Sequence, residues 1–350
     1  INFNKHKRKN LNLSFKTFDI SNTQRSKAKK VQGKKYEIFL NENEHSLITP
    51  KVSFKEILRY YYLYPKNAIP SFKLPFFKPD LSGFSTPHIT WLGHSSLFIS
   101  FKEYKILIDP VFNTHASPIS FINKAFKNAP IYNVNDFNEI FAVIITHSHF
   151  DHLDAKSVKA LKEKARFFIT PLKVGNYLKS YGVSEKKIIE LDWWSGIEFG
   201  DLKIIATPAQ HSSSRGDGKN KTLWASFVME FLSVDKRVFF SADGGYFTHF
   251  KKIGEYFGDF DLACLESGQF NIAWPYSHSF PEQILKEAKD LNTKAVMPIH
   301  WGRFLAGTHA WNEVVKFLYE NLDLPLITPK MGEAYEVGAK FKQDFWWKEE

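Results

Sequence analysis

Short apolar runs, separated by Gly, Asp, Asn and Pro, recur along the chain from residue 88 onward. Runs of this length, rich in Val, Ile and Phe and bounded by turn residues, are typical of β-strands. The predicted strands are 88–92, 96–101, 105–109, 141–146, 167–170, 203–207, 223–231, 237–241, 261–265 and 295–299. The second part of the chain therefore contains enough strands for more than one sheet.

Apolar residues at helical spacing lie between these runs. A proline at residue 281 suits the first turn of a helix, where the missing N–H would have no partner in any case. The predicted helical faces are Val158, Leu161 and Ala165, then Ile284, Ala288 and Leu291, and finally Val314 and Leu318. Strands that alternate with helices predict an α/β fold in which two packed sheets carry helices outside.

The first 85 residues follow a different pattern. A basic arm precedes an aromatic, amphipathic stretch, and prolines then recur at short intervals. The aromatic stretch contains Phe54, Ile57, Leu58, Tyr61 and Tyr62, and the prolines are Pro65, Pro70, Pro75 and Pro79. We therefore expect residues 1–85 to form an arm and Pro-rich linker, and residues 86–350 to form one domain that carries the chemistry.

Composition narrows the class of protein. Of the 350 residues, 43% are hydrophobic and 34 are Phe, which is enough for a large core. The single cysteine, Cys264, excludes an internal disulfide framework and a thiolate-rich zinc site. No run approaches the roughly 18 apolar residues of a membrane span. Because the chain starts at Ile1, removal of an upstream signal or anchor stays open, and we expect a cytoplasmic or membrane-associated protein.

Positive charge is concentrated in the arm. The whole chain has a formal net charge of +10, whereas residues 1–40 hold eleven Lys and Arg against Asp19 and Glu37. One interpretation is a solvated extension. Another is peripheral contact with an anionic membrane, where each Lys or Arg contributes roughly 1 kcal/mol. Nucleic acid phosphates are the least favoured partner, and nothing in the sequence sets the oligomeric state.

The segment His147-Ser148-His149-Phe150-Asp151-His152 carries the strongest chemical signal. It places three imidazoles and a carboxylate directly after the apolar run 141–146. Imidazole nitrogen and carboxylate oxygen both suit Zn²⁺, and a site without thiolates leaves the metal able to activate water. A hydrolytic metal site is therefore favoured over a His-rich surface loop.

Three later segments repeat the same arrangement. His211 follows the run 203–207, and Asp243 follows the run 237–241. His300 comes directly after the run 295–299. Alone, a histidine at such a place is more often a packing or capping residue, but three coincidences beside a four-ligand cluster favour a shared metal centre.

At this point the chain resembles the metallo-β-lactamase superfamily. His147-x-His149-x-Asp151-His152, His211, Asp243 and His300 match its seven ligands in order. The flanking words resemble the N-acylphosphatidylethanolamine-hydrolysing phospholipase D branch, especially its bacterial members, over roughly residues 45–335. These words are Trp91-Leu92-Gly93-His94, Asp109-Pro110-Val111-Phe112, Ala116-Ser117-Pro118, Glu190-Leu191-Asp192-Trp193-Trp194, Pro208-Ala209-Gln210-His211 and Ile299-His300-Trp301-Gly302.

The resemblance implies a fold, a cofactor and a reaction. The fold would be an αββα sandwich of two mixed sheets flanked by helices. Two Zn²⁺ ions would bind per chain, with Mn²⁺ or Fe²⁺ as alternatives, and a hydroxide shared between them would attack a phosphodiester. The first ion would be held by His147, His149 and His211, the second by Asp151, His152 and His300, with Asp243 between them. The substrate would be a lipid of the N-acylphosphatidylethanolamine type or a small-molecule phosphodiester.

Supporting residues are predicted with open alternatives. Asp151, Asp243, His94 and His278 are the candidate catalytic residues, although His94 could simply cap its turn. Asp109 would orient a ligand imidazole or belong to an Asp-Pro turn, and Asp154 would begin a helix or contact a ligand. Trp193 and Trp194 would pack in the core or form an aromatic lip. The candidate substrate-binding residues are Gln269, Phe270, Trp274 and Tyr276.

Two segments depart from the family pattern. The turn reads Ala242-Asp243-Gly244-Gly245, where the family often has Gly-Asp-Thr-Gly, so the ligand stays while a hydroxyl is lost. The segment Leu265-Glu266-Ser267-Gly268-Gln269-Phe270 differs from the mammalian enzyme and is more similar to the bacterial group. Because this segment is a predicted substrate wall, the lipid substrate does not transfer automatically.

Other functions remain as alternatives. The same metal centre would serve a lactone or another carboxylic ester, and a nuclease is less favoured because no added nucleic-acid domain is found. A non-catalytic metal-binding protein would normally have lost some ligands. An iron redox site is disfavoured because the flavodiiron pattern has Glu where this chain has His149. No Gly-x-Ser-x-Gly elbow for a serine nucleophile is present.

Overall fold

The structure is a computed structural model that describes residues 14–23, 25–33, 35–43, 64–120, 122–127, 129–305 and 307–348. The amphipathic stretch predicted around residues 54–62 and the first 13 residues lie outside these ranges. Within the described part of the chain, the helices are too short or too polar to cross a bilayer.

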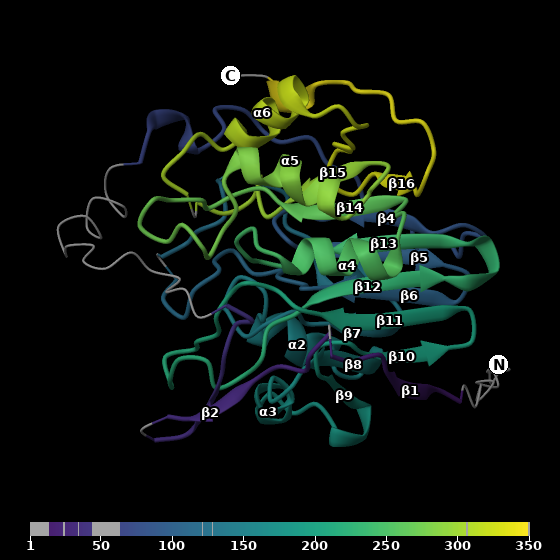
Figure 1. The fold of residues 1–350 in the computed structure, drawn as a ribbon. Coiled ribbons are helices and arrows are strands. Elements are labelled where there is room, and N and C mark those ends of the chain that lie inside the picture. The colour runs from purple at the N-terminus through teal and green to yellow at the C-terminus, as the bar shows by residue number, and fades with distance from the viewer. Residues whose placement is uncertain are drawn as a thin grey trace, which may run out of the picture.

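Two seven-stranded sheets form the body of the protein (Figure 1). In the first sheet, antiparallel pairs join the first five strands, and parallel pairs join the last three. Its order is β1 (Lys16–Asp19), β10 (Ser195–Phe199), β11 (Leu202–Thr207), β12 (Ser226–Phe231), β13 (Lys236–Phe240), β14 (Leu262–Glu266) and β15 (Val296–Ile299). The sheet is therefore mixed.

The second sheet is also mixed, with antiparallel pairs up to β6 and parallel pairs beyond it. Its order is β16 (Ala334–Glu336), β4 (His88–Trp91), β5 (Leu97–Phe101), β6 (Tyr104–Ile108), β7 (Ile140–Ile144), β8 (Ala165–Pro171) and β9 (Ile188–Leu191). Every residue of β5 and β7 is buried, as expected for strands covered on both faces.

Helices flank the two sheets. The helices are α2 (Ala155–Leu161), α3 (Gly175–Ser180), α4 (His249–Phe257), α5 (Pro281–Asp290) and α6 (Glu313–Asn321). Short 3₁₀ turns occur at Lys66–Ala68, Val134–Asp136, Glu185–Lys187, Leu232–Val234 and Trp346–Lys348. In Figure 1, α4 and α5 lie in front of the first sheet, and α5 contacts β14. The predicted fold of two mixed sheets with helices outside is confirmed.

All ten predicted strands are present, with ends that differ by up to three residues. One helical prediction was wrong in detail. Ala165 does not share a helical face with Val158 and Leu161, because α2 ends at Leu161 and Ala165 is the first residue of β8. The helix α4 was missed, although Phe250, Ile253 and Phe257 have helical spacing and are buried.

The described part of the arm packs on the body of the protein. The strand β1 adds to the edge of the first sheet beside β10, and β2 (Lys30–Gln32) pairs with β3 (Glu37–Phe39) as a separate ribbon. Phe39 at the end of this ribbon is completely buried. Residues 16–39 therefore contribute both a strand and core packing.

A stack of tryptophans fixes the C-terminal segment against the sheets. The ring of Trp301 lies parallel to three others, at centroid distances of 5.0 Å from Trp91, 5.5 Å from Trp346 and 5.7 Å from Trp311. The indole N–H of Trp346 donates to the carbonyl oxygen of Thr328 at 2.9 Å. Since Trp301 follows His300, this stack also supports the end of β15.

We expect the Trp346→Ala variant to lose about 3–5 kcal/mol of unfolding free energy, because a large buried ring leaves a cavity in the stack. Chemical denaturation measures this loss. The matched control is Ile131→Ala, since Ile131 is 55% exposed and its truncation should change stability by less than about 0.5 kcal/mol. A loss below about 1 kcal/mol for Trp346→Ala would contradict the structural role of the stack.

Candidate metal centre

The candidate ligands lie beyond the carboxyl ends of strands that run in the same direction. In the second sheet β4, β6 and β7 are mutually parallel, and the chain then continues to His94, Asp109 and His147. In the first sheet β11, β13, β14 and β15 share one direction. The carboxyl ends of such strands meet at one edge of each sheet, so residues far apart in sequence come together there.

A backbone bridge joins the two edges. The His300 N–H donates to the His94 carbonyl oxygen, and the His94 N–H donates to the Trp301 carbonyl oxygen, both at 2.9 Å. The rings of His94 and His300 then lie 4.1 Å apart, measured between centroids. The end of β15 is thereby tied to the turn after β4.

The first group of side chains consists of His147, His149 and His211. His149 Nδ1 lies 2.9 Å from His147 Nε2 and 3.1 Å from His211 Nε2. A single proton on His149 Nδ1 can satisfy one of these contacts only. Three nitrogens bound tetrahedrally to one Zn²⁺ would be roughly 3.3 Å apart, given Zn–N distances near 2.0–2.1 Å. The observed spacing fits a cation at the centre of the group.

The second group consists of Asp151, His152 and His300, with Asp243 beside them. Asp243 Oδ2 lies 3.1 Å from both His152 Nε2 and His300 Nε2. Asp151 Oδ2 lies 3.6 Å and 3.4 Å from the same two nitrogens. Asp151, His152 and His300 form a possible ligand group together with His94, and Asp243 forms one with His147 and His152.

Asp243 stands between the two groups. Besides its contacts with His152 and His300, its Oδ2 lies 4.0 Å from His147 Nε2 and 3.9 Å from His211 Nε2. Asp243 is 2% exposed, and its Oδ1 has no hydrogen-bond partner among the described residues. His152 Nε2 is likewise buried and has no hydrogen-bond partner in the described part of the chain, although Asp243 Oδ2 lies 3.1 Å away. Buried polar atoms without partners are costly, so both atoms are suited to metal ligation.

Asp109 orients one candidate ligand. Its Oδ2 lies 2.7 Å from His152 Nδ1 and accepts from the Thr146 hydroxyl at 2.6 Å, while its Oδ1 accepts from the Thr146 N–H at 2.8 Å. The contact between Asp109 and His152 assigns a ring proton of His152 to Nδ1 and leaves its Nε2 directed to the centre. The structure therefore supports a role for Asp109 as an orienting carboxylate more than as a simple turn residue.

Of the two roles predicted for Asp154, the structure shows the one at the start of a helix. Its carboxylate accepts from the Lys156 N–H, the Ser157 N–H and the Ser157 hydroxyl, so it caps the amino end of α2. Trp193 and Trp194 are 1% and 0% exposed and are core residues. Neither tryptophan forms a lip around the centre.

His94 and His278 both lie beside candidate ligands. His94 Nε2 is 3.1 Å from Asp151 Oδ2. The Nδ1 of His278 pairs with Glu266 Oε1, and its ring centroid is 5.5 Å from that of His300. His278 also forms a possible ligand group with Asp243 and His300. Both predicted catalytic histidines are thus close enough to contact a substrate bound at the centre.

Glu266 belongs to the site, and sequence reasoning missed its role. It ends β14, is 2% exposed, and its Oε2 accepts from the Gly244 N–H at 2.9 Å. Burial raises its pKa, while the contact with His278 opposes that shift. The signal was its position at a strand end, which it shares with Asp109 and Asp243. The segment was instead considered only as a substrate wall.

Electrostatics differ between the two groups. Burial keeps the pKa of His147 and His211 well below the usual range and lowers that of His149 to about 4. These three rings are therefore neutral, with free lone pairs at neutral pH. Burial also disfavours a charged His300, yet Asp243 and Asp151 outweigh it and raise the His300 pKa to about 10. The carboxylates of the second group thus attract positive charge.

Several residues of the site have left-handed backbone conformations. The φ angle is 53° at His94, 42° at Asp109 and 66° at His300. Ala242 and Gln269 have φ angles of 57° and 60°. Such conformations cost energy for residues other than glycine and concentrate at functional sites. The fold therefore holds strained turns at the ends of these strands.

Gly245 is required because a side chain at this position would collide with the backbone of a neighbouring segment. A Cβ at this position would lie 2.4 Å from the carbonyl oxygen of Tyr276. The glycine lets the turn after Asp243 pack directly on the segment that precedes His278. Although this turn departs from the Gly-Asp-Thr-Gly of the family, Asp243 still lies among the candidate ligands.

Arg215 fixes the loop that carries the His cluster. One guanidinium nitrogen, Nη1, donates to the carbonyl oxygens of Ser148 at 2.8 Å, Leu153 at 2.9 Å and His149 at 3.4 Å. The guanidinium carbon lies 4.1 Å from the ring centroid of Phe150. These contacts connect the loop after His211 with the loop between β7 and α2. Sequence reasoning did not identify this residue.

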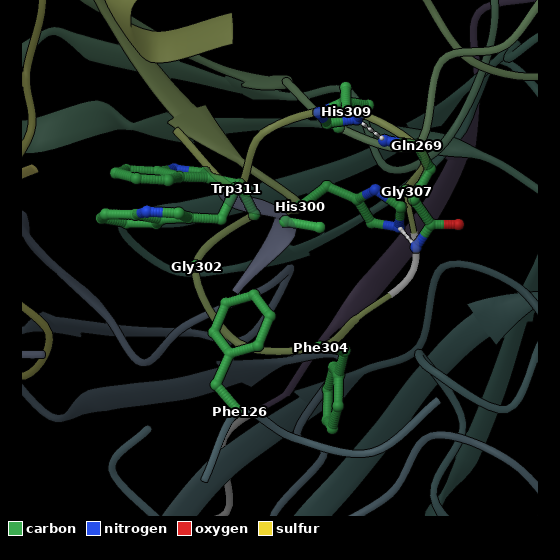
Figure 2. A pocket seen from close by; sticks show the side chains of 11 residues that line it. Phe126, Gln269, His300, Gly302, Phe304, Gly307, His309 and Trp311 are labelled. Atoms are coloured by element: carbon green, nitrogen blue, oxygen red, sulfur yellow. Dashed lines mark hydrogen bonds between the residues drawn. The ribbon is translucent and has the colours of Figure 1, made fainter. Parts of the chain in front are cut away.

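A small cavity of about 20 Å³, roughly enough for one water molecule, adjoins His300 (Figure 2). Phe126, Phe304, Trp311 and His309 contribute most of its aromatic wall. Gln269 lies at the boundary with the metal centre, since its Nε2 is 3.4 Å from both Asp151 Oδ2 and His300 Nε2. No Lys or Arg lines this cavity in the described part of the chain.

The other three predicted substrate residues are Phe270, Trp274 and Tyr276. Phe270 stacks on His309 with 4.4 Å between ring centroids, and the Trp274 indole N–H donates to the Gln269 carbonyl oxygen at 2.8 Å. Tyr276 is 39% exposed. These three residues do not line the cavity, and their roles in substrate binding stay predictions.

Comparisons with known proteins agree with this geometry. Residues 104–301 match the family described as "Beta-lactamase superfamily domain". The chain is 33% identical over 267 residues to an uncharacterized protein of Mycobacterium tuberculosis, covering 74% of this chain and 71% of that protein. It is 29% identical over 273 residues to N-acyl-phosphatidylethanolamine-hydrolyzing phospholipase D 1 of Caenorhabditis elegans, covering 72% of this chain and 76% of the relative.

Solved structures share the fold. The isothiocyanate hydrolase from Delia radicum gut bacteria superposes with a TM-score of 0.57 at 21% identity, over 71% of this chain and 99% of that chain. The metallo hydrolase Igni18 of Ignicoccus hospitalis superposes with a TM-score of 0.53 at 23% identity, over 73% of this chain and 100% of that chain. At these identities the likeness extends to the fold alone.

We expect Arg215→Met to weaken metal binding by about 10–100-fold, as removal of groups that orient ligands commonly does. The substitution preserves much of the side-chain volume but leaves the carbonyl oxygens of Ser148 and Leu153 without their charged donor. Competition with a chelator measures the affinity for Zn²⁺. The control Arg166→Met removes the same charge from β8. Equal affinities for Zn²⁺ in the two variants would contradict the role of Arg215.

Proposed function

The chain belongs to the β-lactamase superfamily domain family and is a metal-dependent hydrolase with the metallo-β-lactamase fold. From this premise we propose that it is a phosphodiesterase of phospholipase D type that acts on N-acylphosphatidylethanolamine-like lipids with two Zn²⁺ ions. The observation that carries the proposal is the pair of ligand groups around Asp243, next to a cavity with aromatic walls. The relative in Caenorhabditis elegans supports the choice of substrate class.

The distances support the two ligand sets that the resemblance implies. His147, His149 and His211 would hold one ion, and Asp151, His152 and His300 would hold the other, with Asp243 shared. When bound, two such cations lower the pKa of water and neutralise negative charge on a phosphodiester. All ligands are nitrogen or oxygen donors, which suits Zn²⁺.

The remaining side chains would position the substrate and move protons. His278 has its Nδ1 engaged by Glu266, so Nε2 would be the nitrogen that delivers a proton to the leaving alkoxide, with the doubly protonated imidazolium as the reacting form. His94 is close to Asp151 and would contact a phosphate oxygen of the substrate. Gln269 can donate a hydrogen bond through Nε2 at the boundary between the metal centre and the cavity.

The cavity would take an apolar part of the substrate next to the scissile bond. Its aromatic walls favour apolar groups, but its enclosed volume of about 20 Å³ is far below the roughly 300–1,000 Å³ that is usual for ligand sites. Only a small group beside the scissile bond would enter it, and the acyl chains of an amphiphile would lie outside. The basic arm would attract the protein to an anionic membrane surface.

A second candidate function is hydrolysis of a lactone or another carboxylic ester. The specific observation in its favour is the cavity itself, which is compact and has no Lys or Arg among its described lining. A small neutral ester bound beside it would need no Lys or Arg as a partner. The two functions use the same ligands and differ in the bond that is cleaved.

The test compares three substrates with the zinc-loaded protein. N-acylphosphatidylethanolamine in vesicles, a soluble aryl phosphodiester and a set of lactones are each incubated, and mass spectrometry identifies the products. We expect phosphatidic acid and N-acylethanolamine from the lipid. The Asp243→Asn variant should lose at least about 100-fold in turnover, since it removes the carboxylate shared by both ion sites.

The same assay separates the candidate functions. Turnover of the aryl diester alone would reject the lipid substrate, and turnover of lactones alone would establish the second candidate. Full activity of Asp243→Asn would contradict a two-metal mechanism. A truncation of residues 1–13 removes Lys5, Lys7, Arg8 and Lys9 but keeps β1. It should slow hydrolysis in anionic vesicles at low salt and leave soluble diesters unaffected.

A further inference from the structure

The N-terminal arm reaches the metal centre. After β1 it follows the first sheet, where the Ala28 N–H donates to Asp192 Oδ1 at 3.1 Å. In Figure 1 the purple ribbon that carries β2 then lies beside the lower end of the molecule. Beyond β3 the chain places Asn41 directly against His211. An element that the sequence assigns to the periphery thus touches a candidate ligand.

The carboxamide of Asn41 brackets the backbone of His211. Its Oδ1 accepts from the His211 N–H at 3.0 Å, and its Nδ2 donates to the His211 carbonyl oxygen at 2.9 Å. The Trp224 indole N–H also donates to Asn41 Oδ1, at 3.1 Å. If the amide were rotated by 180°, its NH₂ group would face the N–H groups of His211 and Trp224, and no hydrogen bond could form. These contacts therefore fix the orientation of the side chain.

The position of His211 explains the need for this contact. The strand β11 ends at Thr207, four residues earlier, so no strand ladder holds the His211 backbone. The side chain is held by the Ser277 carbonyl oxygen, which lies 3.0 Å from Nδ1. Asn41 therefore supplies to His211 the pair of hydrogen bonds that a neighbouring strand would otherwise supply.

The arm also supports the rest of this loop. The Phe39 N–H donates to the Asn220 carbonyl oxygen at 2.9 Å, and the Lys219 N–H donates to the Tyr36 hydroxyl at 3.0 Å. Asn220 Oδ1 in turn accepts from the Ser213 N–H at 3.1 Å. The loop between His211 and Trp224 is consequently docked on residues 36–41 at both of its ends.

We propose that Asn41 is a positioning residue of the metal centre: its carboxamide sets the backbone of His211, and the N-terminal arm thereby completes the site. The inference rests on the proposed role of His211 as a metal ligand. Among the hydrogen-bond partners of Asn41 in the described part of the chain, His211 is the one candidate ligand, and the other partner is Trp224. Its loss should therefore affect the ion held by His147, His149 and His211 more than the other.

The experiment measures metal binding by the full chain. Metal-free wild type, Asn41→Leu and Asn41→Ala are titrated with Co²⁺, whose visible absorption reports ligand geometry, and with Zn²⁺ in competition with a chelator. The matched control is Asn176→Leu, which makes the same substitution at an exposed residue of α3. Thermal unfolding of the metal-free proteins, compared with the control, separates lost metal binding from lost folding.

We expect wild type and Asn176→Leu to bind two ions with the same affinities. Asn41→Leu should bind one ion at least about tenfold more weakly with an altered cobalt spectrum, while the second ion binds as in wild type. Asn41→Ala should show the same selective loss to a smaller degree, because water can occupy the space. If Asn41→Leu does not fold, Asn41→Ala gives the deciding result.

The outcomes separate this inference from the proposed function. If wild type binds two ions and the folded Asn41 variants bind both with unchanged affinity and spectrum, the positioning role is wrong and the metal centre stands. If both ions are weakened equally and in proportion to lost stability, Asn41 is only structural and the inference also fails. If wild type binds no ion, the metal centre and the role of Asn41 fail together.

Discussion

The convergence of buried imidazoles and carboxylates at one point is the constraint on which the rest of the structure depends. Two ring nitrogens, of His147 and His211, lie about 3 Å from His149 Nδ1, and two carboxylates meet the imidazoles of His152 and His300. Buried polar groups are stable only when they are paired. Within the described residues, hydrogen bonds leave Asp243 Oδ1 and His152 Nε2 unsatisfied. Two cations would satisfy these atoms together.

The surrounding structure holds these buried polar groups close together, although the turns that carry them are strained. Strand ends from both sheets deliver the ligands, and left-handed turns at His94, Asp109 and His300 direct the chain there. Contacts from distant segments then hold the loops: Arg215 binds the carbonyl oxygens of the His cluster, and Asn41 brackets His211. Metal affinity in this protein should therefore depend on residues that never touch the metal.

The sequence predicted those features that depend on local patterns. Each candidate ligand directly follows, or closely follows, an apolar run, so both the strands and the ligands could be found by inspection. Arg215 and Asn41 had no such signal, because their partners lie more than 60 and more than 160 positions away. Glu266 was overlooked although it ends a strand in the same way as the ligands. The assignment of Ala165 to a helix failed because α2 ends at Leu161. Only the three residues Lys162–Lys164 separate its end from β8, which begins at Ala165.

The most direct test of the account is the location of metal ions in crystals of the zinc-loaded protein, determined by anomalous scattering at the zinc edge. The account predicts two peaks. One should lie about 2.0–2.2 Å from nitrogens of His147, His149 and His211, and the other at similar distances from Asp151, His152 and His300, with Asp243 bound to both. The absence of both peaks, or a single ion bound outside these residues, would contradict it.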